Sequence, residues 1–377
     1  MTQRILLACL LSLLLSPAQA ITPVVVAEGL HHPWAVAFLP GGDFLVSERS
    51  GALRVVDRQG RIGAPIEGLP AIASGGQGGL LDVVLDSAFA RNRQLYFCFS
   101  EPAAQGPGNS TALASATLSA DRRRLEQVRI LFSQQPKIRS DLHFGCRIVE
   151  SRTPQGIPDG QLFLTLGERY SQSQDAQTLD NHHGKVIRIS KDGSVPRDNP
   201  FVGVQGARPE IWSYGHRNPQ GAALAPDGTL WIHEHGPRGG DEINLPRAGG
   251  NYGWPRVSFG QNYNLTPVGE GKTALAGTEP PLHYWTPSIA PSGMTFVSTD
   301  KYGKDWRGNL LVGALKLTHL ARLELARPFA GKVVRETRLL SELGERIRDV
   351  REAPDGFIYV LTDSPRGKLI RLQPLSN

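Results

Sequence analysis

The sequence predicts an all-β fold, a six-bladed β-propeller with four-stranded antiparallel blades. Three observations lead to this prediction. Glycine and proline are abundant, with 42 Gly and 28 Pro in 377 residues, which favours many short elements over long helices. One short phrase of turn residues followed by a strand recurs six times. The spacing of the copies suits the length of a propeller blade.

Each copy of the phrase joins a tight turn to an apolar strand. The four clear copies are PGGDFLV (40–46), PDGQLFL (158–164), PDGTLWI (226–232) and PDGFIYV (354–360), and the weaker ones are RNRQLYF (91–97) and WRGNLLV (306–312). Asp-Gly or Gly-Gly between apolar runs is typical of hairpins, because Gly accepts the positive φ of their turns. The turn positions, separated by 51, 67, 68, 80 and 48 residues, are Gly42, Arg93, Gly160, Gly228, Gly308 and Gly356. One such unit holds about four strands of ordinary length.

The length and the two ends of the chain fit a closed ring. Removing the first 20 of 377 residues leaves 357, or about 60 for each of six blades. The run Val24–Val26 and the stretch 369–372 are expected to share one blade, which closes the ring without a free edge. A solenoid would need capping ends, and a sandwich would not repeat six times. No linker divides residues 21–377, so we expect a single domain there.

The first 20 residues have the pattern of a secretory signal peptide. Arg4 supplies the positive start, residues 5–15 are apolar but too short to span a bilayer, and Pro17 precedes an expected cleavage after Ala20. No other apolar run approaches 18 residues in length. We therefore expect no membrane span and a periplasmic or secreted protein.

Charge and cysteine content narrow the function classes. The chain carries a formal charge of +6, but its basic residues are scattered, and the one run, Arg122–Arg124, is expected in a solvated turn. This argues against a nucleic-acid partner. Cys9 leaves with the signal peptide, so Cys98 and Cys146 remain. An oxidising compartment would let them pair, but we take two buried apolar thiols as the default.

Polar or aromatic clusters recur at the start of the strand that precedes each turn phrase. The six clusters are 31–34, 76–79, 141–144, 216–219, 288–292 and 346–349. Equivalent positions in a ring of blades lie around one axis at one end, so these clusters should meet in a single funnel. A second ring comes from the loops that leave the repeated strands, at Glu48, 167–169, 235–238, Lys316 and Asp363.

Four of the converging residues are cations, namely Arg217, Lys316, Arg346 and Arg348. Taken singly, each is more simply a surface or inter-blade salt-bridge residue. Four cations around one cavity would repel each other unless an anion occupied it, and planar Arg side chains bind carboxylates bidentately. Together they predict a pocket for a polyanionic small ligand.

Five segments carry a resemblance to a known family. They are GHRNPQG (215–221), HGPRGGDEIN (235–244), GGNYGWP (249–255), GALK (313–316) and ERIRDV (345–350). With them, the chain from Val26 to Leu372 resembles the soluble aldose sugar dehydrogenases of the glucose/sorbosone dehydrogenase family, which depend on pyrroloquinoline quinone (PQQ). The resemblance implies a six-bladed propeller that oxidises an aldose to a lactone, passes electrons to a soluble acceptor, and exists as a monomer or homodimer.

The resemblance also implies roles for individual residues. His143 would be the general base, a task that suits a neutral imidazole, and Arg217 would act beside it in catalysis. The implied PQQ contacts are Asn218, Ala314, Leu315, Lys316, Arg346, Ile347 and Arg348. The implied sugar contacts are Gln77, Asp141, Arg217 and Tyr263. Calcium, a hard cation suited to oxygen ligands, would lie at Gly236 and Pro237, with a further calcium at Glu242 and Tyr252.

The residues also bear on three alternatives to these assignments. His233 and His235 would share a face of a strand and invite a zinc site, but no cysteine or third histidine is placed to help. A calcium-dependent sugar lactonase would crowd the axis with acidic and amide ligands, whereas the clusters supply cations. A propeller that only binds would not need His143 beside Arg217. The loop 167–169 reads Gly-Glu-Arg, closer to broadly aldose-oxidising relatives than to glucose-selective ones, so the sugar is left open.

Overall fold

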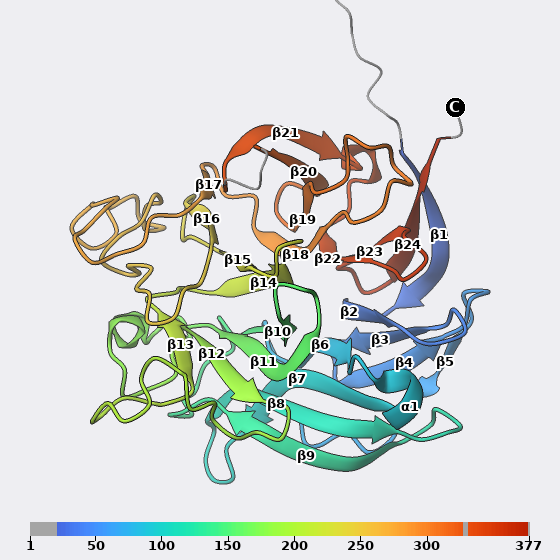
Figure 1. The fold of residues 1–377 in the computed structure, drawn as a ribbon, viewed down its shortest axis with the longest axis horizontal. Helices are drawn as coiled ribbons and strands as arrows, with labels where there is room; N and C mark the ends of the chain where they lie inside the picture. The colour runs from blue at the N-terminus through green and yellow to red at the C-terminus, as the bar shows by residue number, and fades with distance from the viewer. Residues whose placement is uncertain (1–20, 327–330, 376–377) are drawn as a thin grey trace, which may run out of the picture.

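The computed structural model describes residues 21–326 and 331–375, so the predicted signal peptide lies outside the described residues. The described chain forms six four-stranded antiparallel sheets, arranged as the blades of a β-propeller (Figure 1). This confirms the fold class predicted from the repeat.

Each blade is a meander, and five of the six follow the chain without interruption. Blade one holds β2 (Pro33–Phe38), β3 (Phe44–Glu48), β4 (Ala52–Val56) and β5 (Ile62–Pro65). Blade two holds β6 (Leu80–Leu85), β7 (Gln94–Pro102), β8 (Asn109–Leu118) and β9 (Leu125–Ser133). Blade three holds β10 (Gly145–Arg152), β11 (Pro158–Leu166), β12 (Lys185–Ser190) and β13 (Ile211–Tyr214).

The remaining strands complete the ring. Blade four holds β14 (Pro219–Leu224), β15 (Leu230–Glu234), β16 (Asp241–Asn244) and β17 (His283–Trp285). Blade five holds β18 (Pro291–Phe296), β19 (Leu310–Ala314), β20 (His319–Leu325) and β21 (Val333–Leu339). Blade six holds β22 (Ile347–Glu352), β23 (Ile358–Thr362), β24 (Gly367–Pro374) and β1 (Ile21–Leu30). Helical turns are short: α1 (Phe89–Asn92), η1 (Ser173–Gln177) and η2 (Ser341–Leu343).

The ring closes by pairing the two ends of the chain. β1 runs antiparallel to β24, with Val24 opposite Arg371 and Val25 opposite Ile370. This confirms that the two apolar stretches share a blade, and it closes the ring by joining the two ends of the chain within blade six. The first strands of the blades, β2, β6, β10, β14, β18 and β22, contact one another around the axis (Figure 1).

The repeated turns have the backbone that the sequence predicts. The five glycines have φ between 79° at Gly356 and 92° at Gly42, and Arg93 has a φ of 53°. Five of the turn positions lie directly before the second strand of their blade, and Gly160 lies within the first residues of β11, so all six copies of the phrase stand at equivalent places. The left-handed backbone explains why glycine dominates these positions.

Apolar side chains fill the spaces between neighbouring blades. Phe97 and Phe99 on β7 pack in one cluster with residues of blades one and three. Trp231 of blade four meets Phe296 of blade five edge to face, with ring centroids 5.3 Å apart. Burying each such aromatic side chain contributes about 1.5–3 kcal/mol, and these contacts fix each blade against both of its neighbours.

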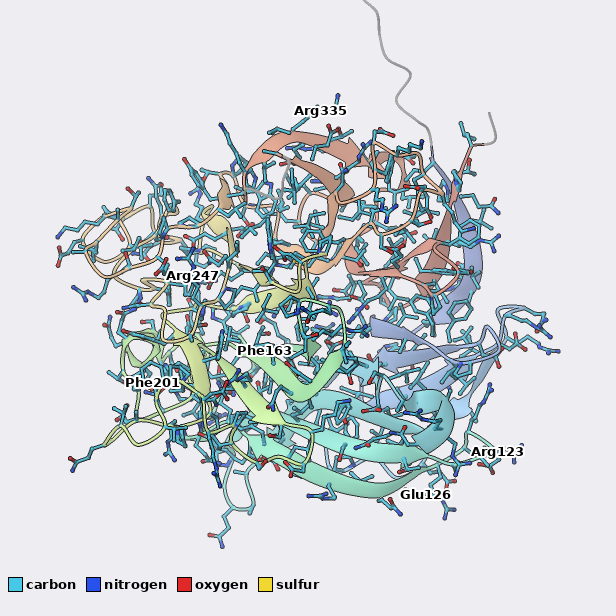
Figure 2. All side chains as sticks on the ribbon, viewed as in Figure 1. Arg123, Glu126, Phe163, Phe201, Arg247 and Arg335 are labelled. Carbon is cyan, nitrogen blue, oxygen red and sulfur yellow. A yellow bond between two sulfur atoms is a disulfide. The ribbon has the colours of Figure 1, made fainter. Side chains whose placement is uncertain are left out.

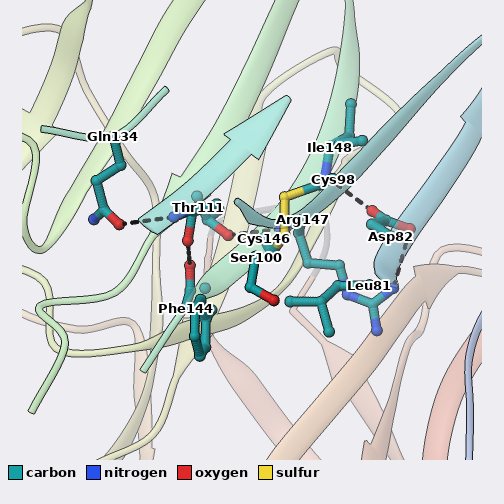
Figure 3. Close-up of a disulfide and its surroundings, with 12 residues drawn as sticks. Leu81, Asp82, Cys98, Ser100, Thr111, Gln134, Phe144, Cys146, Arg147 and Ile148 are labelled. Atoms are coloured by element: carbon teal, nitrogen blue, oxygen red, sulfur yellow. Dashed lines mark hydrogen bonds and ion pairs between the residues drawn. A yellow bond between two sulfur atoms is a disulfide. The ribbon is translucent and has the colours of Figure 1, made fainter. Parts of the chain in front are cut away.

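Charged side chains fill the axis itself. Arg147 on β10 lies 2.9 Å from Asp349 on β22, and Arg351 lies 2.6 Å from Asp82 on β6. Asp82, Arg147 and Asp349 are buried, and Figure 3 shows Asp82 beside Arg147. The two axial carboxylates are thus matched by two guanidinium groups, and they are not a cluster of free acidic ligands.

Cys98 on β7 and Cys146 on β10 form a disulfide between blades two and three (Figure 3). Their Cα atoms are 5.8 Å apart, a usual separation for a disulfide. The default expectation of two free thiols was therefore wrong, although both residues are buried as expected. The cysteines are 48 residues apart, and only the packing of one blade against the next brings them together.

The basic run lies far from the axis. Arg122 and Arg124, in the turn between β8 and β9, pair with Asp43 and Glu67, and Figure 2 shows Arg123 at the outer edge of the molecule. This is the solvated turn that the sequence predicts. Within 21–326 and 331–375, no helix has the length and apolar character needed to cross a membrane.

Candidate active site

All six blades contribute to one cavity at the starts of their first strands. It has a volume of about 140 Å³. Its lining residues are Trp34, Arg49, Gln77, Leu81, Phe144, Gly145, Gln220, His235, Ala290, Leu315, Arg346 and Arg348. Five of the six predicted clusters therefore supply a lining residue, whereas blade four contributes Gln220 and His235 and none of its predicted cluster 216–219.

The cavity is cationic, but not through the four cations that the sequence suggested. Arg346 and Arg348 line it, whereas the Lys316 side chain is exposed and Arg217 lines a smaller neighbouring pocket. Arg49, which sequence reasoning missed, takes part instead. It lies in the loop that leaves β3, directly after Glu48, so the equivalence of those loops was the signal that could have found it.

Asp363 holds the two arginines of blade six. Its carboxylate lies 2.8 Å from Arg348 and 3.4 Å from Arg346, and its other oxygen bonds Nδ1 of His32 at 2.9 Å. Burial alone would raise the pKa of Asp363, but Arg348 and the His32 hydrogen bond hold it well below its ordinary value. The carboxylate therefore stays ionised and orients Arg348 at the cavity wall.

His143 lies next to this cavity, in the loop between β9 and β10. It is buried, and its backbone has a φ of 50°. Its N–H donates to the side-chain oxygen of Gln77 at 2.8 Å, which ties it to blade two. Its Nδ1 lies 3.2 Å from Oε2 of Glu168, a buried carboxylate that follows β11. Nε2 is left as the ring nitrogen that can meet a substrate.

The surroundings of His143 favour the neutral imidazole. Burial lowers the pKa of His143, and the nearby cations Arg217 and Arg169 lower it further, while Glu168 acts in the opposite direction. A neutral ring at neutral pH can accept a proton. Tyr170, whose ring meets that of His143 edge to face at 5.4 Å, is 52% exposed and forms the outer wall beside it.

Arg217 and Asn218, which lead into β14 of blade four, also lie near the base. The Arg217 guanidinium donates to the carbonyls of His235 and Gly236 at 3.1 and 3.0 Å, and lies 5.2 Å from the Trp254 ring. The Asn218 side chain is buried, and its oxygen accepts the Gly145 N–H at 3.2 Å. Asn218 thus supports the segment that carries His143.

A small oxygen-rich pocket adjoins Arg217. It contains the carboxylates of Glu234 and Glu242, which are paired across β15 and β16, together with Gly236 and Tyr252. Burial and the neighbouring Glu234 raise the pKa of Glu242 well above its ordinary value. Two adjacent carboxylates, Glu234 buried and Glu242 half-buried, lie beside carbonyl oxygens and form a donor set that fits a hard dication such as calcium.

Tyr252 and Pro237 are two of the predicted calcium positions. The Tyr252 hydroxyl donates a hydrogen bond to the Leu245 carbonyl. The main-chain carbonyl of Tyr252 is therefore the oxygen that remains for a metal. Pro237 is buried directly after Gly236 in the loop between β15 and β16.

The histidine pair does not form a zinc site in the described residues. His233 is buried with both ring nitrogens unpartnered, and Nε2 of His235 bonds the Pro291 carbonyl at 2.7 Å. In residues 21–326 and 331–375, no group of three or more His, Cys, Asp or Glu side chains is arranged to hold a metal ion.

The remaining predicted residues divide into those near the cavity and those away from it. Leu315 lines the cavity, and its carbonyl accepts Arg346 at 3.2 Å, while Ala314 and Ile347 are buried beside it at strand ends. Asp141 is exposed, and its carbonyl accepts the Gln77 N–H at 2.8 Å. Tyr263 is 66% exposed and does not line the cavity.

Comparisons with known proteins show the family to which the chain belongs. The family model for Glucose / Sorbosone dehydrogenase matches residues 30–371. Aldose sugar dehydrogenase YliI of Escherichia coli K12 is 43% identical over 371 residues, covering 98% of this chain and 97% of its own length. A crystal structure of a glucose dehydrogenase is 46% identical with a TM-score of 0.88, covering 94% of this chain and 100% of its own. The PQQ-bound aldose sugar dehydrogenase of Streptomyces coelicolor is 27% identical with a TM-score of 0.73, covering 95% and 100%.

Proposed function

The chain belongs to the glucose / sorbosone dehydrogenase family and is an oxidoreductase that acts on sugars, and from this premise we propose a specific reaction. An aldose is oxidised at its anomeric carbon to the lactone, with PQQ as the hydride acceptor and calcium as the metal. The observation that carries the proposal is a buried His143, favoured as neutral and flanked by Glu168, beside a cavity lined by arginines.

The cavity provides the charge that a tricarboxylated quinone requires. Arg346, Arg348 and Arg49 line it, and planar guanidinium groups bind carboxylates bidentately. Leu315 and the Trp34 ring supply apolar wall, and the exposed Lys316 side chain at the same edge is free to turn toward a bound carboxylate. The carbonyls of Gly236 and Pro237 would hold the calcium beside the quinone, and Glu242 and Tyr252, with the adjacent Glu234, would hold the further calcium.

When bound, PQQ would supply the two-electron acceptor, and calcium would supply a Lewis acid that makes it a better one. Residues of the protein would transfer the proton and stabilise the charges that develop. His143 takes the proton from the anomeric hydroxyl at Nε2 as the C1 hydrogen leaves with its electron pair. Glu168 stabilises the imidazolium that results. Arg217, fixed by the His235 and Gly236 carbonyls, supplies positive charge beside the site where negative charge develops.

The location and assembly of the protein belong to the same proposal. We expect residues 1–20 to be removed on export, residues 21–377 to act as one domain in the periplasm or outside the cell, and a soluble acceptor to reoxidise the quinone. A monomer or homodimer is sufficient, because all the site residues named above come from one chain.

The test is dye-coupled aldose oxidation by the purified protein with no addition, with calcium, with PQQ, and with both. We expect full activity only with both. Sugar oxidation with calcium alone would contradict the quinone, and lactone hydrolysis without oxidation would favour the lactonase.

A substitution of the base tests the mechanism. His143→Ala should lower kcat by about 10²- to 10⁴-fold while PQQ still binds, as measured from its absorption spectrum. His182→Ala, which removes another buried histidine of blade three, is the control and should retain activity. Near-normal turnover of His143→Ala would refute the assignment.

A further inference from the structure

His143 belongs to a backbone segment whose conformation depends on contacts with its surroundings. His143, Gly145 and Cys146 all have positive φ, at 50°, 69° and 82°. For residues other than glycine this conformation costs about 1–3 kcal/mol each and persists only where the surroundings enforce it. The register between β10 and β11 also shifts between Gly145 and Ile148. Something outside the strand ladder must therefore hold the base.

The Arg169 side chain is in a position to do this. It is fully buried, at 0% exposure, and its guanidinium reaches both sides of His143. On one side Nε donates to the Leu142 carbonyl at 3.0 Å, and Nη2 donates to the Ser140 carbonyl. On the other side the guanidinium lies 3.9 Å from the centre of the Phe144 ring.

The same guanidinium anchors the segment to blade two. Nη1 donates to the Asn109 carbonyl at 3.1 Å and Nη2 to its side-chain oxygen at 2.6 Å. Ser140 returns a hydrogen bond from its hydroxyl to the Arg169 carbonyl at 2.8 Å. None of these acceptors is a carboxylate, so the interactions fix geometry without neutralising the cation.

Arg169 directly follows Glu168 in the sequence. The loop that carries both residues therefore meets the loop that carries His143 as one unit. Glu168 presents its carboxylate to Nδ1 of His143 and also accepts the N–H of Tyr170. The approach is close: a Cβ atom at Gly167 would lie 2.1 Å from the His143 carbonyl. A shift of either loop would change the distance between the base and its carboxylate.

We propose that Arg169 is a positioning residue for the sugar oxidation: its guanidinium clamps the loop that carries His143 to the loop that carries Glu168. The proposal rests on the proposed function and adds a residue to it. Arg169 does not touch the substrate; it acts through the position of His143 and through its positive charge. The charged groups that act on His143 are Glu168, Arg217 and Arg169 itself.

Two variants separate the geometry from the charge. Arg169→Lys keeps the charge but loses the planar fork that reaches three residues at once. Arg169→Met removes the charge as well. We expect Arg169→Lys to bind PQQ normally, with a kcat at least about tenfold lower, because small misplacements of a catalytic group are costly, and with little change in KM. We expect Arg169→Met to move the acid limb of the pH profile upward, because a cation that lowers the pKa of His143 is gone.

Arg322→Lys is the matched control. Arg322 is also buried against an aromatic ring, 4.4 Å from the centre of Trp306, and binds the Asn309 side chain at 3.1 Å. Unlike Arg169 it also pairs with the Asp305 carboxylate at 3.0 Å, and it belongs to blade five and lines none of the site. It should lose thermal stability to a similar extent while its kcat and pH profile stay unchanged. Equal losses of kcat in both lysine variants, or a kcat of Arg169→Lys within twofold of the native value, would overturn the proposal.

A measurement without turnover keeps this test separate from the proposed function. The His143 ring can be titrated by NMR with labelled histidine in the cofactor-free protein, native and Arg169→Met. A rise in the pKa of His143 in the variant supports the clamp even if the native protein fails to oxidise any aldose, an outcome that would refute the proposed reaction alone. If the pKa of His143 and the contacts of its ring are the same in Arg169→Met as in the native protein, the proposed role of Arg169 is overturned, whatever the activity.

Discussion

Replacing Glu168 with glutamine tests the electrostatic support of the base. The Oε2 atom of Glu168 lies 3.2 Å from Nδ1 of His143, and both side chains are buried. At that separation two unit charges attract by about 5 kcal/mol at an effective dielectric constant of about 20, and by about 1.3 kcal/mol in bulk water. The attraction arises only when His143 becomes an imidazolium, so it favours the transition state over the ground state.

The expected loss follows from the middle of this range. About 3 kcal/mol corresponds to about 100-fold in kcat, since each 1.36 kcal/mol is a factor of ten. The assay is kcat at saturating aldose with PQQ and calcium, together with PQQ binding measured from absorption. PQQ binding should be unaffected, because Glu168 does not line the cavity of the arginines.

Glu210→Gln is the matched control for this prediction. Glu210 lies 3.3 Å from Nε2 of His182, a similar pair that lies outside the site, and its replacement should leave kcat within about twofold of the native value. A kcat of Glu168→Gln within about threefold of the native value would mean that His143 does not gain a charge in the rate-limiting transition state.

Two further predictions concern pH and the disulfide. Because burial and neighbouring cations lower the pKa of His143, the acid limb of kcat/KM should lie below the ordinary histidine pKa of about 6.5. The same lowered pKa makes unfolding easier as the pH falls below that value, because the histidine of the unfolded chain binds a proton before that of the folded chain does. An acid limb above pH 7 in the rate profile would contradict this. Replacing Cys98 and Cys146 with alanine should destabilise the fold by up to about 4 kcal/mol for a separation of 48 residues, and an unchanged denaturant midpoint in a titration monitored by fluorescence would refute it.

The fold was predictable because its signal is periodic and local. A turn residue with positive φ followed by an apolar strand recurs in each unit, glycine in five of them, as at Gly160 and Gly228, and Arg93 in the other, and the six copies fix the number of blades. Ring closure followed from apolar runs at both ends, and the convergence of His143 and Arg348 on one end followed from equivalent positions in the repeat.

The details of the site were less predictable, because a repeat places a backbone position and leaves the side-chain direction open. Lys316 occupies the predicted edge, where its N–H bonds the Ile289 carbonyl, but its side chain points to solvent. Arg217 turns to the His235 and Gly236 carbonyls rather than into the main cavity. The disulfide was missed for a related reason, since sequence spacing carries no information about which strands face each other across two blades.

The geometry of His143 depends on the closed ring of blades, because the residue lies where several blades meet. The segment 143–146 lies where blades two, three and four meet, and its main-chain groups bond across those boundaries. The Thr111 hydroxyl donates to the Phe144 carbonyl at 2.6 Å, the Gly145 N–H donates to Asn218 at 3.2 Å, and Cys146 is joined to Cys98. Neighbouring blades therefore supply the contacts that the strained segment cannot supply for itself. A closed ring suits this task, because each blade is fixed on both sides, and the strain at His143 is maintained by packing that no single blade could provide.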